Sequence, residues 1–413
     1  MRSIQKNKIL GVLLGTIVEY YDYSLYGFSA SVIAINFFPS TDILTSLAHT
    51  FAIYAVAYLA KPLGSVIFGY VGDRFGRKIA LNFTILGMVI PTAVIGCLPV
   101  YSTLGIWGTV ILVLCRFTQG IFMAGEYDGA AIYVIEHLGS KYQYTASAIT
   151  RTTGVIGLLL GIGTSNLFKS HIFPEWGWRI PFLLSLPLAL ATLYYRKQLI
   201  ETPDFQNTKR SQVPLRSTID LCKSQWKFLL MAVLIAGGFG VTYQISIVLM
   251  KQYLPIVLPQ SSSFISILSI FLVILLGVSM LMSGLCADRF GVAKVMRISV
   301  FVTIIACMLL SIAITYKLLQ LALISCLLLA IAIAPFNGLA HGILIQGFEI
   351  KERYRSISLG HSFGSMVMSG AANYICLMFM KSFGWHLFPV IYVAVFAVLF
   401  YISISIYQNQ LSQ

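Results

Sequence analysis

Charged side chains are scarce in this sequence. Asp, Glu, Lys and Arg make up 10% of its 413 residues, whereas 58% of the residues are hydrophobic. Because a soluble domain carries about 25% charged residues, this composition excludes a soluble enzyme, a secreted disulfide scaffold and a disordered chain. Acidic residues number 14 against 28 basic ones, but the basic residues lie in short segments between long apolar runs. This indicates membrane topology rather than a nucleic-acid-binding face.

Paired cysteines and nucleotide-binding motifs are also absent. None of the seven cysteines forms a CxxC pair, their number is odd, and most lie within apolar runs. We therefore expect neither a disulfide nor a metal site. The sequence contains no nucleophile motif and no phosphate-binding loop, which argues against an enzyme and against ATP-driven pumping.

Long apolar runs dominate what is present. A helix needs about 20 apolar residues to cross the hydrocarbon core. The first run follows three basic residues as in a signal peptide, but Glu19 and Asp22 interrupt it and no small-residue cleavage site follows, so we interpret it as a retained membrane helix. The sequence predicts an all-α integral membrane protein with twelve spans, at roughly 10–37, 47–71, 79–99, 104–137, 142–168, 179–196, 226–251, 264–287, 295–315, 318–346, 355–380 and 385–407.

The distribution of Lys and Arg predicts the orientation of these spans. Twenty of the 28 basic residues lie at the N-terminus and in the loops of one side, and five lie in the loops of the other side. Loops rich in Lys and Arg remain in the cytoplasm. We therefore predict that both termini and the central loop are cytoplasmic, in a bacterial inner (plasma) membrane.

A polar segment and an internal repeat divide the chain. Residues 197–225 form the one long polar stretch, a predicted cytoplasmic linker between six-helix halves at 1–196 and 226–413. Residues 69–81 read GYVGDRFGRKIAL and residues 284–296 read GLCADRFGVAKVM, with Gly, Asp, Arg, Phe and Gly in register. Two duplicated six-span halves are a transporter architecture, with the solute site between the halves near the midplane.

Several motifs carry a family resemblance. The sequence resembles the major facilitator superfamily, and within it the metabolite:proton symporter family, which includes the proline/betaine, ketoglutarate, citrate and shikimate permeases. The resemblance implies alternating access by a monomer that uses the proton-motive force and no cofactor. The motifs are DRFGRK at 73–78, GTIVEYYDYSLYG at 15–27, KPLG at 61–64, RFTQG at 116–120, GEY at 125–127, WGWRIPF at 176–182 and ETPDF at 201–205.

Ionisable residues inside the spans are functional candidates, because a charge at the bilayer centre costs about 3 kcal/mol or more. Carboxyl groups in low dielectric have raised proton affinity and are suited to carry a proton. The alternative is that each carboxylate is held in a permanent ion pair. The predicted proton-coupling residues are Glu19, Asp22, Glu126 and Asp128.

Polar residues of both halves are candidates for solute binding. Arg116, Gln119, Met123 and Glu126 share one face of the fourth span, and Arg116 could attract an anionic group of the solute or hold a carboxylate in place. Arg151 could line the cavity or snorkel toward the interface, and the same snorkelling alternative applies to Lys61. The predicted solute-binding residues are Arg116, Gln119, Tyr26, Arg151, Tyr243, Gln244 and Asn337.

Charges at the cytoplasmic ends of the spans form a separate group. The family resemblance implies that they make a latch that holds the halves together while the protein faces outward. The alternative is that they are simply positive-inside residues. The predicted gating residues are Asp73, Arg77, Glu136, Asp288, Arg353 and Arg355.

Other conspicuous residues have structural interpretations. Four glycines line the fifth span, at 154, 157, 161 and 163, and small residues there predict close helix packing. We interpret His341 and His361 as helix-packing residues, and the two tryptophans at 176 and 178 as anchors at the membrane interface.

The sequence therefore predicts a secondary transporter, a proton-coupled symporter of a small zwitterionic or carboxylate metabolite. It is not expected to be an enzyme, and its partners are the solute, protons and the lipid bilayer, with no nucleic acid. The alternatives are an exporter or importer of a larger metabolite, such as a carboxylate siderophore, and a transporter-like sensor that moves nothing.

Overall fold

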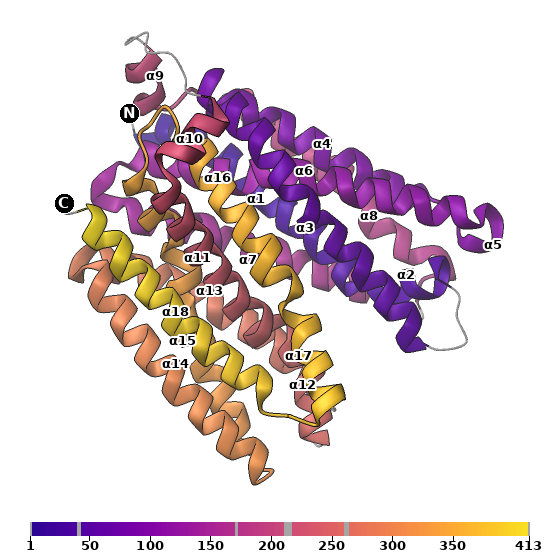
Figure 1. Cartoon of the computed structure of the whole chain (residues 1–413). Coiled ribbons are helices and arrows are strands. Elements are labelled where there is room, and N and C mark those ends of the chain that lie inside the picture. Colours follow the sequence, from indigo (N-terminus) through magenta and orange to yellow (C-terminus); the bar gives the residue numbers. More distant parts are fainter. Residues whose placement is uncertain (1, 39–42, 170–171, 210–216, 260–263, 412–413) are drawn as a thin grey trace. The chain divides into compact units, whose positions relative to one another are not determined.

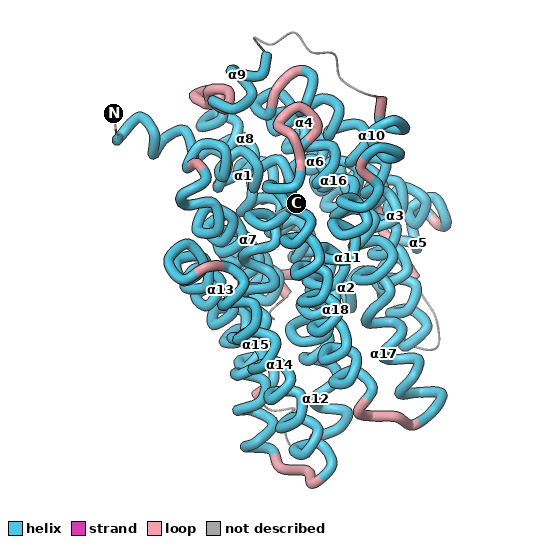
Figure 2. The backbone as a smooth tube through the Cα atoms, turned by 60° about the vertical axis from the view of Figure 1, so that its left-hand side comes forward, coloured by secondary structure: helices cyan, strands magenta, loops and turns pink. Residues whose placement is uncertain are grey.

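The computed structural model describes residues 2–38, 43–169, 172–209, 217–259 and 264–411. In these residues every regular element is helical, as Figure 2 shows, and no β-strand occurs. The chain forms two compact units. Unit 1 comprises Met1–His137, Thr153–Leu215 and Ile350–Ser358, and unit 2 comprises Leu138–Thr152, Arg216–Glu349 and Leu359–Gln413. The all-α class predicted from the sequence is confirmed.

Unit 1 contains most of the helices of the first half of the chain (Figure 1). They are α1 (Arg2–Phe28), α2 (Ala30–Phe37), α3 (Ile43–Arg74), α4 (Arg77–Cys97), α5 (Tyr101–Leu104), α6 (Ile106–Leu138), η2 (Glu175–Arg179), α8 (Ile180–Arg196) and α9 (Pro203–Lys209). It also includes α7 (Gln143–Phe168) from Thr153 onward and the first turns of α16 (Arg353–Gly364).

Unit 2 contains the helices of the second half together with the beginning of α7. They are η1 (Ser140–Tyr142), α10 (Thr218–Ser224), α11 (Trp226–Tyr243), the π-helical η3 (Gln244–Leu249), α12 (Met250–Val257), α13 (Ile265–Phe290), α14 (Val292–Thr315), α15 (Leu319–Leu344), η5 (Ile345–Gly347), the rest of α16, the π-helical η6 (Ser365–Ser369), α17 (Gly370–Phe383) and α18 (Phe388–Leu411).

Ten helices of the described residues are long and apolar enough to cross a membrane. They coincide with the third to twelfth predicted spans. The first predicted span, 10–37, is divided at Ser29 into α1 and α2, and the second, 47–71, lies within α3. The predicted halves, 1–196 and 226–413, and the linker between them remain predictions.

The repeated motif forms two glycine turns. Gly76 lies between α3 and α4 with φ +113°, and Gly291 lies between α13 and α14 with φ +88°. Both values fall in the region that a residue with a Cβ rarely adopts. Both copies of the motif therefore form a turn at a glycine.

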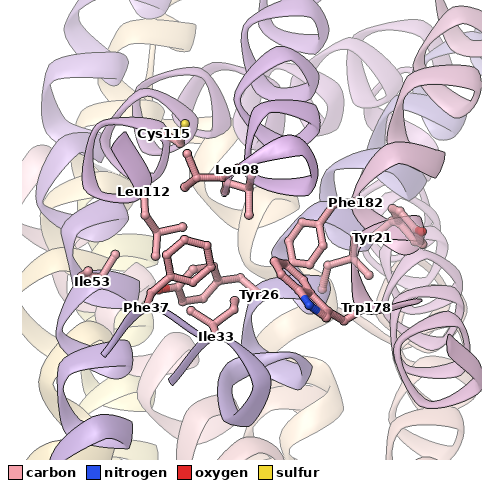
Figure 3. Close-up of a cluster of buried hydrophobic side chains, with 12 residues drawn as sticks. Tyr21, Tyr26, Ile33, Phe37, Ile53, Leu98, Leu112, Cys115, Trp178 and Phe182 are labelled. Atoms are coloured by element: carbon pink, nitrogen blue, oxygen red, sulfur yellow. The ribbon is translucent and has the colours of Figure 1, made fainter. Parts of the chain in front are cut away.

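A buried apolar cluster fills unit 1 around the break between α1 and α2. Tyr21 and Tyr26 of α1 and Phe37 of α2 pack there with Phe182 of α8, and Figure 3 shows the cluster. Trp178 belongs to it and is 5% exposed, so its predicted role as an interface anchor is wrong. Its ring packs edge-on against Phe182 and Phe37.

Glycines bring α7 close to α1 in unit 1. A Cβ added to Gly157 would collide with the backbone carbonyl of Ile17, and a Cβ on Gly161 would collide with the Ser24 hydroxyl. A Cβ on Gly163 would meet nothing within 4 Å. The packing predicted for this span is therefore found at Gly154, Gly157 and Gly161 and not at Gly163.

We predict that Gly157→Ala destabilises the protein by about 1–3 kcal/mol, because a backbone atom cannot move aside for the new methyl group. Gly163→Ala on the same helix is the matched control and should leave the melting temperature unchanged or slightly raised, since Ala is the better helix former. Thermal unfolding of the purified variants measures both. Equal melting temperatures for the two variants would contradict the close α1–α7 contact.

Candidate functional site

A chain of buried polar groups crosses unit 1 from α1 to α6. The Thr92 hydroxyl of α4 donates to Oδ2 of Asp22 at 2.9 Å and accepts from Nε2 of Gln119 at 2.6 Å. Oε1 of Gln119 accepts from Nη1 of Arg116 at 2.9 Å, and the Arg116 guanidinium lies 4.3 Å from the centroid of the Tyr26 ring. Four residues predicted for proton coupling or solute binding are thus brought together, and Thr92 is the member that the sequence did not reveal.

Glu19 lies one turn before Asp22 on α1. Its side chain is fully buried, and that of Asp22 is 4% exposed. Two carboxyl groups at this spacing share a helix face, and burial of a charged carboxylate is costly. Both predicted carboxyl groups are therefore buried on the same helix.

Glu126 of α6 is held by an arginine to which the sequence analysis assigned no role. Arg196, the last residue of α8, forms a two-pronged ion pair with Glu126 and is fully buried. The Thr84 hydroxyl adds a hydrogen bond to Oε2 of Glu126 at 2.6 Å. Gly15 makes room for the pair, because a Cβ there would lie 2.5 Å from Oε1 of Glu126. Glu126 thus occupies the buried ion pair that was the alternative to a proton-coupling role.

Asp128 and Tyr354 connect α6 to the beginning of α16. Oδ2 of Asp128 accepts from the Ser358 hydroxyl at 3.0 Å, and that hydroxyl lies 3.1 Å from the carbonyl of Ala124. The Tyr354 hydroxyl donates to the carbonyl of Gly125. All of these residues belong to unit 1, so the predicted proton-coupling residue Asp128 binds a segment from the second half of the sequence.

Five of the predicted gating residues gather in one buried charge cluster of unit 1. Nη1 of Arg77 lies 3.6 Å from Oδ1 of Asp73, and Nη2 of Arg77 lies 3.3 Å from Oε1 of Glu136. Nη1 of Arg353 lies 3.1 Å from the same Glu136 oxygen, and Nε of Arg355 lies 3.9 Å from Oδ2 of Asp73. The cluster therefore joins α3, α4, α6 and α16.

Asp73 also binds the N-terminus of α16. Its two oxygens accept from the backbone N–H groups of Tyr354 and Arg355 at 3.2 and 3.1 Å. Asp73 lies beyond the predicted second span, and burial raises the pKa of its carboxyl to about 7, against the opposing effect of Arg77 and the two N–H groups. Its protonation would weaken its bond to the helix start.

Asp288, the remaining predicted gating residue, lies in unit 2 and has the equivalent partners. Its oxygens accept from the backbone N–H groups of Tyr144 and Thr145, the second and third residues of α7, at 3.1 and 2.9 Å. Tyr354 and Arg355 are the second and third residues of α16. The sequence repeat is thus also a repeat of contacts.

Two acidic residues of the ETPDF segment contribute to the cluster, and the sequence analysis assigned them no role. Oε1 and Oε2 of Glu201 accept from the backbone N–H groups of Arg77 and Lys78 at the start of α4, at 3.0 and 3.2 Å. Oδ2 of Asp204 lies 3.2 Å from Nη1 of Arg353. The signal that could have identified them is their position within a motif that recurs in the family.

The predicted solute-binding residues of unit 2 form two groups. Nη2 of Arg151 lies 2.8 Å from Nδ1 of His341, and the His341 ring packs edge-on against His361 at 6.0 Å. Arg151 is therefore buried and does not snorkel. Elsewhere Gln244, at the start of the π-helical η3, accepts from Asn373 at 3.3 Å. Tyr243 precedes it.

Asn337 of α15 is 8% exposed. Its side-chain amide donates to the carbonyl of Ile333 one turn earlier at 3.0 Å. The structure thus places it in unit 2 on the helix that also carries His341.

We predict that Glu126→Gln destabilises the protein by about 3–5 kcal/mol, because it leaves the Arg196 guanidinium buried without its counter-charge. The double variant Glu126→Leu, Arg196→Met should lose less stability than Glu126→Gln or Arg196→Met alone, since it removes both charges. Thermal unfolding of these three purified variants tests this. A Glu126→Gln protein as stable as wild type would contradict the buried ion pair.

A comparison with protein families identifies the first half of the chain. Residues 8–220 match the family model described as "Sugar (and other) transporter". This segment contains the polar chain from Asp22 to Arg116 and the first copy of the repeat.

Two characterised relatives are similar along most of the sequence. The proline/betaine transporter of Salmonella typhimurium is 34% identical over 304 residues, which is 69% of this chain and 60% of that protein. The proline/betaine transporter of Escherichia coli K12 is 29% identical over 411 residues, 95% of this chain and 81% of that protein. The chain thus matches less than two thirds of the length of the first relative.

Solved structures share the fold. The proton:xylose symporter XylE superposes with a TM-score of 0.81 at 17% identity, covering 97% of this chain and 95% of that one. The transporter FucP in its outward conformation gives 0.72 at 11% identity, with coverage of 97% and 99%. The family match over residues 8–220 confirms the resemblance stated from the sequence motifs, and the chain belongs to the sugar (and other) transporter family of the major facilitator superfamily.

Proposed function

We propose that the protein is a proton-coupled symporter that takes up a small zwitterionic metabolite across the bacterial inner membrane, with both termini in the cytoplasm. The observation that carries this proposal is the buried chain that connects the Asp22 carboxyl to the Arg116 guanidinium through Thr92 and Gln119. A carboxyl group can load a proton, and a guanidinium can bind the carboxylate of a solute. The names of the relatives, proline/betaine transporters, favour a zwitterion.

Thr92 is the switch in this chain. Its hydroxyl has one hydrogen and two acceptors within reach, Oδ2 of Asp22 at 2.9 Å and its own helix carbonyl at Met88 at 3.0 Å. An ionised Asp22 takes this hydrogen. A protonated Asp22 can donate its own proton to the hydroxyl oxygen, which releases the Thr92 hydrogen to Met88. The protonation state of Asp22 is thereby transmitted to Gln119 and Arg116.

Solute binding would use Arg116, at the other end of the hydrogen-bonded chain from Asp22. The Arg116 guanidinium has five N–H donors in a planar fork, a geometry that matches a carboxylate. One of these N–H groups binds Gln119 in the structure. A solute carboxylate competes with Gln119 for the guanidinium, and the rearrangement of Gln119 reaches Asp22 through Thr92. Proton and solute thus act on one hydrogen-bonded chain.

The charge cluster around Asp73 supports alternating access. It attaches residues 350–358 of the second half to helices of the first half through Asp73, Arg77, Glu136 and Asp204. We assign it the role of a cytoplasmic gate that opens when these contacts break. Asp288 performs the corresponding role at the start of α7.

The proposal is tested by the external pH of weakly buffered cells that overexpress the protein, while amino acids, betaines and di- or tricarboxylates are added. We expect alkalinisation with a zwitterionic solute and none in Asp22→Asn cells. The exposed carboxylate Glu175 supplies the matched control, and Glu175→Gln should behave as wild type. If no solute changes the pH although the protein reaches the membrane, the conclusion shifts to export or to a larger substrate such as a siderophore.

In proteoliposomes, Asp22→Asn and Glu19→Gln should abolish uphill accumulation of the solute and retain solute exchange, because exchange needs no proton release. Radiolabelled uptake with an imposed pH gradient measures the first, and counterflow measures the second. Accumulation at the wild-type level in both variants would refute the assignment of the proton site.

Arg116→Lys should raise the KM for the solute about tenfold, because an ammonium cannot form the two parallel hydrogen bonds of a guanidinium to a carboxylate. Arg179 provides the matched control. It lies outside the polar chain, and its Nη1 donates to the carbonyl of Leu98 at 2.6 Å. Arg179→Lys should leave the KM unchanged. A KM unaffected by Arg116→Lys would place the solute carboxylate elsewhere.

A further inference from the structure

A lysine ammonium is buried among tyrosine rings in unit 1, outside the chain from Asp22 to Arg116. The ammonium of Lys61 lies 4.6 Å from the centroid of the Tyr58 ring and 5.8 Å from that of Tyr127. Lys61 is 6% exposed and Tyr58 is 7% exposed. Lys61 therefore does not snorkel, although the sequence left that alternative open.

Two further tyrosines hold these rings in place. The hydroxyl groups of Tyr58 and Tyr23 are 2.7 Å apart and share a hydrogen bond. The Tyr127 ring stacks on Tyr20 at 6.1 Å with an interplanar angle of 24°. Gly154 of α7 gives the Tyr20 ring its space, because a Cβ there would lie 2.7 Å from it. We call Tyr20, Tyr23, Tyr58 and Tyr127 the tyrosine cage.

The cage has the chemistry of a site for an organic cation. The face of an aromatic ring carries negative charge density and attracts a cation within about 6 Å, and sites of this kind recognise quaternary ammonium groups. The occupant in this structure is an ammonium on a flexible four-carbon stem. Such a stem can withdraw without moving a helix, so the Lys61 ammonium can leave the cage while the rings stay in place.

The tyrosine cage shares no residue with the site at Arg116. Tyr127 follows Arg116 by eleven residues on α6, which places their Cα atoms within about 20° on the helix face and about 16 Å apart along its axis. The same face of α6 thus carries an anion-binding group and, closer to the predicted cytoplasmic end, a cation-binding one.

We propose that the tyrosine cage is a second binding site of the transport route, for the alkylated ammonium group of the solute, and that Lys61 occupies it until the solute displaces it. The inference rests on the proposed function, since it assumes a zwitterionic solute. Lys61 then keeps the cage filled with positive charge whenever solute is absent, and the displaced ammonium is available to the carboxylate of the entering solute.

The test uses the purified full-length protein and tetramethylammonium chloride, a probe with the ammonium group and no carboxylate. The melting temperature is recorded against increasing probe, with sodium chloride at the same ionic strength as reference. We compare wild type with Lys61→Met, which removes the cation from the cage, and with Lys61→Arg, which keeps a cation in it. Lys61→Met should bind the probe with a dissociation constant at least about fivefold lower than wild type, and Lys61→Arg should show no such gain.

A second substitution tests whether the tighter binding of tetramethylammonium depends on the rings. Adding Tyr127→Leu to Lys61→Met should abolish the tighter binding. Adding Tyr194→Leu, at a tyrosine of α8 that is 64% exposed, should not. A gain that survives Tyr127→Leu, or no gain in folded Lys61→Met, overturns the inference. If Lys61→Met does not fold, Tyr127→Leu and Tyr194→Leu are compared in the otherwise wild-type protein. The assay is competition between tetramethylammonium and labelled glycine betaine. Loss of competition in Tyr127→Leu alone supports the cage, and equal competition in both variants refutes it.

Failure of the proposed function gives a different result. If no zwitterion is accumulated but Lys61→Met binds tetramethylammonium through Tyr127, the cage stands and the proposed transport activity does not. If zwitterions are accumulated and the substitutions leave probe binding and competition unchanged, the transport activity stands and the cage is refuted.

Discussion

The first N–H groups of a helix have no hydrogen-bond acceptor within the helix, so buried helix starts need acceptors from elsewhere in the protein. In this protein carboxylates are those acceptors. Asp73 accepts from the start of α16, Asp288 from the start of α7 and Glu201 from the start of α4. Each carboxylate gains two N–H donors and the favourable end of a helix dipole. The turns at Gly76 and Gly291, and the Arg77 cluster, are arranged around these three contacts.

Two of these contacts explain why the compact units differ from the sequence halves. Residues 350–358 cluster with unit 1, which contains Asp73, and residues 138–152 cluster with unit 2, which contains Asp288. The start of α16, from the second half of the sequence, therefore belongs to unit 1, and the start of α7, from the first half, belongs to unit 2. The proposed alternating access requires release of these helix starts. Burial raises the pKa of the Asp73 carboxyl to about 7, so protonation near neutral pH would weaken one of these contacts.

The sequence predicted the third to twelfth spans, because apolar length is a local property. It also placed Arg116 and Gln119 on one face of α6, since helical periodicity brings them together, but it did not predict that Thr92 joins Gln119 to Asp22. It assigned no role to Arg196, because an arginine at the end of an apolar run looks like a positive-inside residue until its partner 70 residues earlier is known. The tyrosine cage escaped for the same reason, since its rings come from α1, α3 and α6.

The Glu126–Arg196 pair has a consequence for how the protein is made. Arg196 also binds the backbone carbonyls of Gly11 in α1 and Leu81 in α4, so one side chain at the end of the sixth predicted span ties four helices together. During synthesis Glu126 enters the membrane well before Arg196 leaves the ribosome. Until then its carboxyl lacks its counter-charge, and an isolated charge is costly in hydrocarbon. These four helices of the first half can therefore be joined by Arg196 only after α8, the last of them, is inserted.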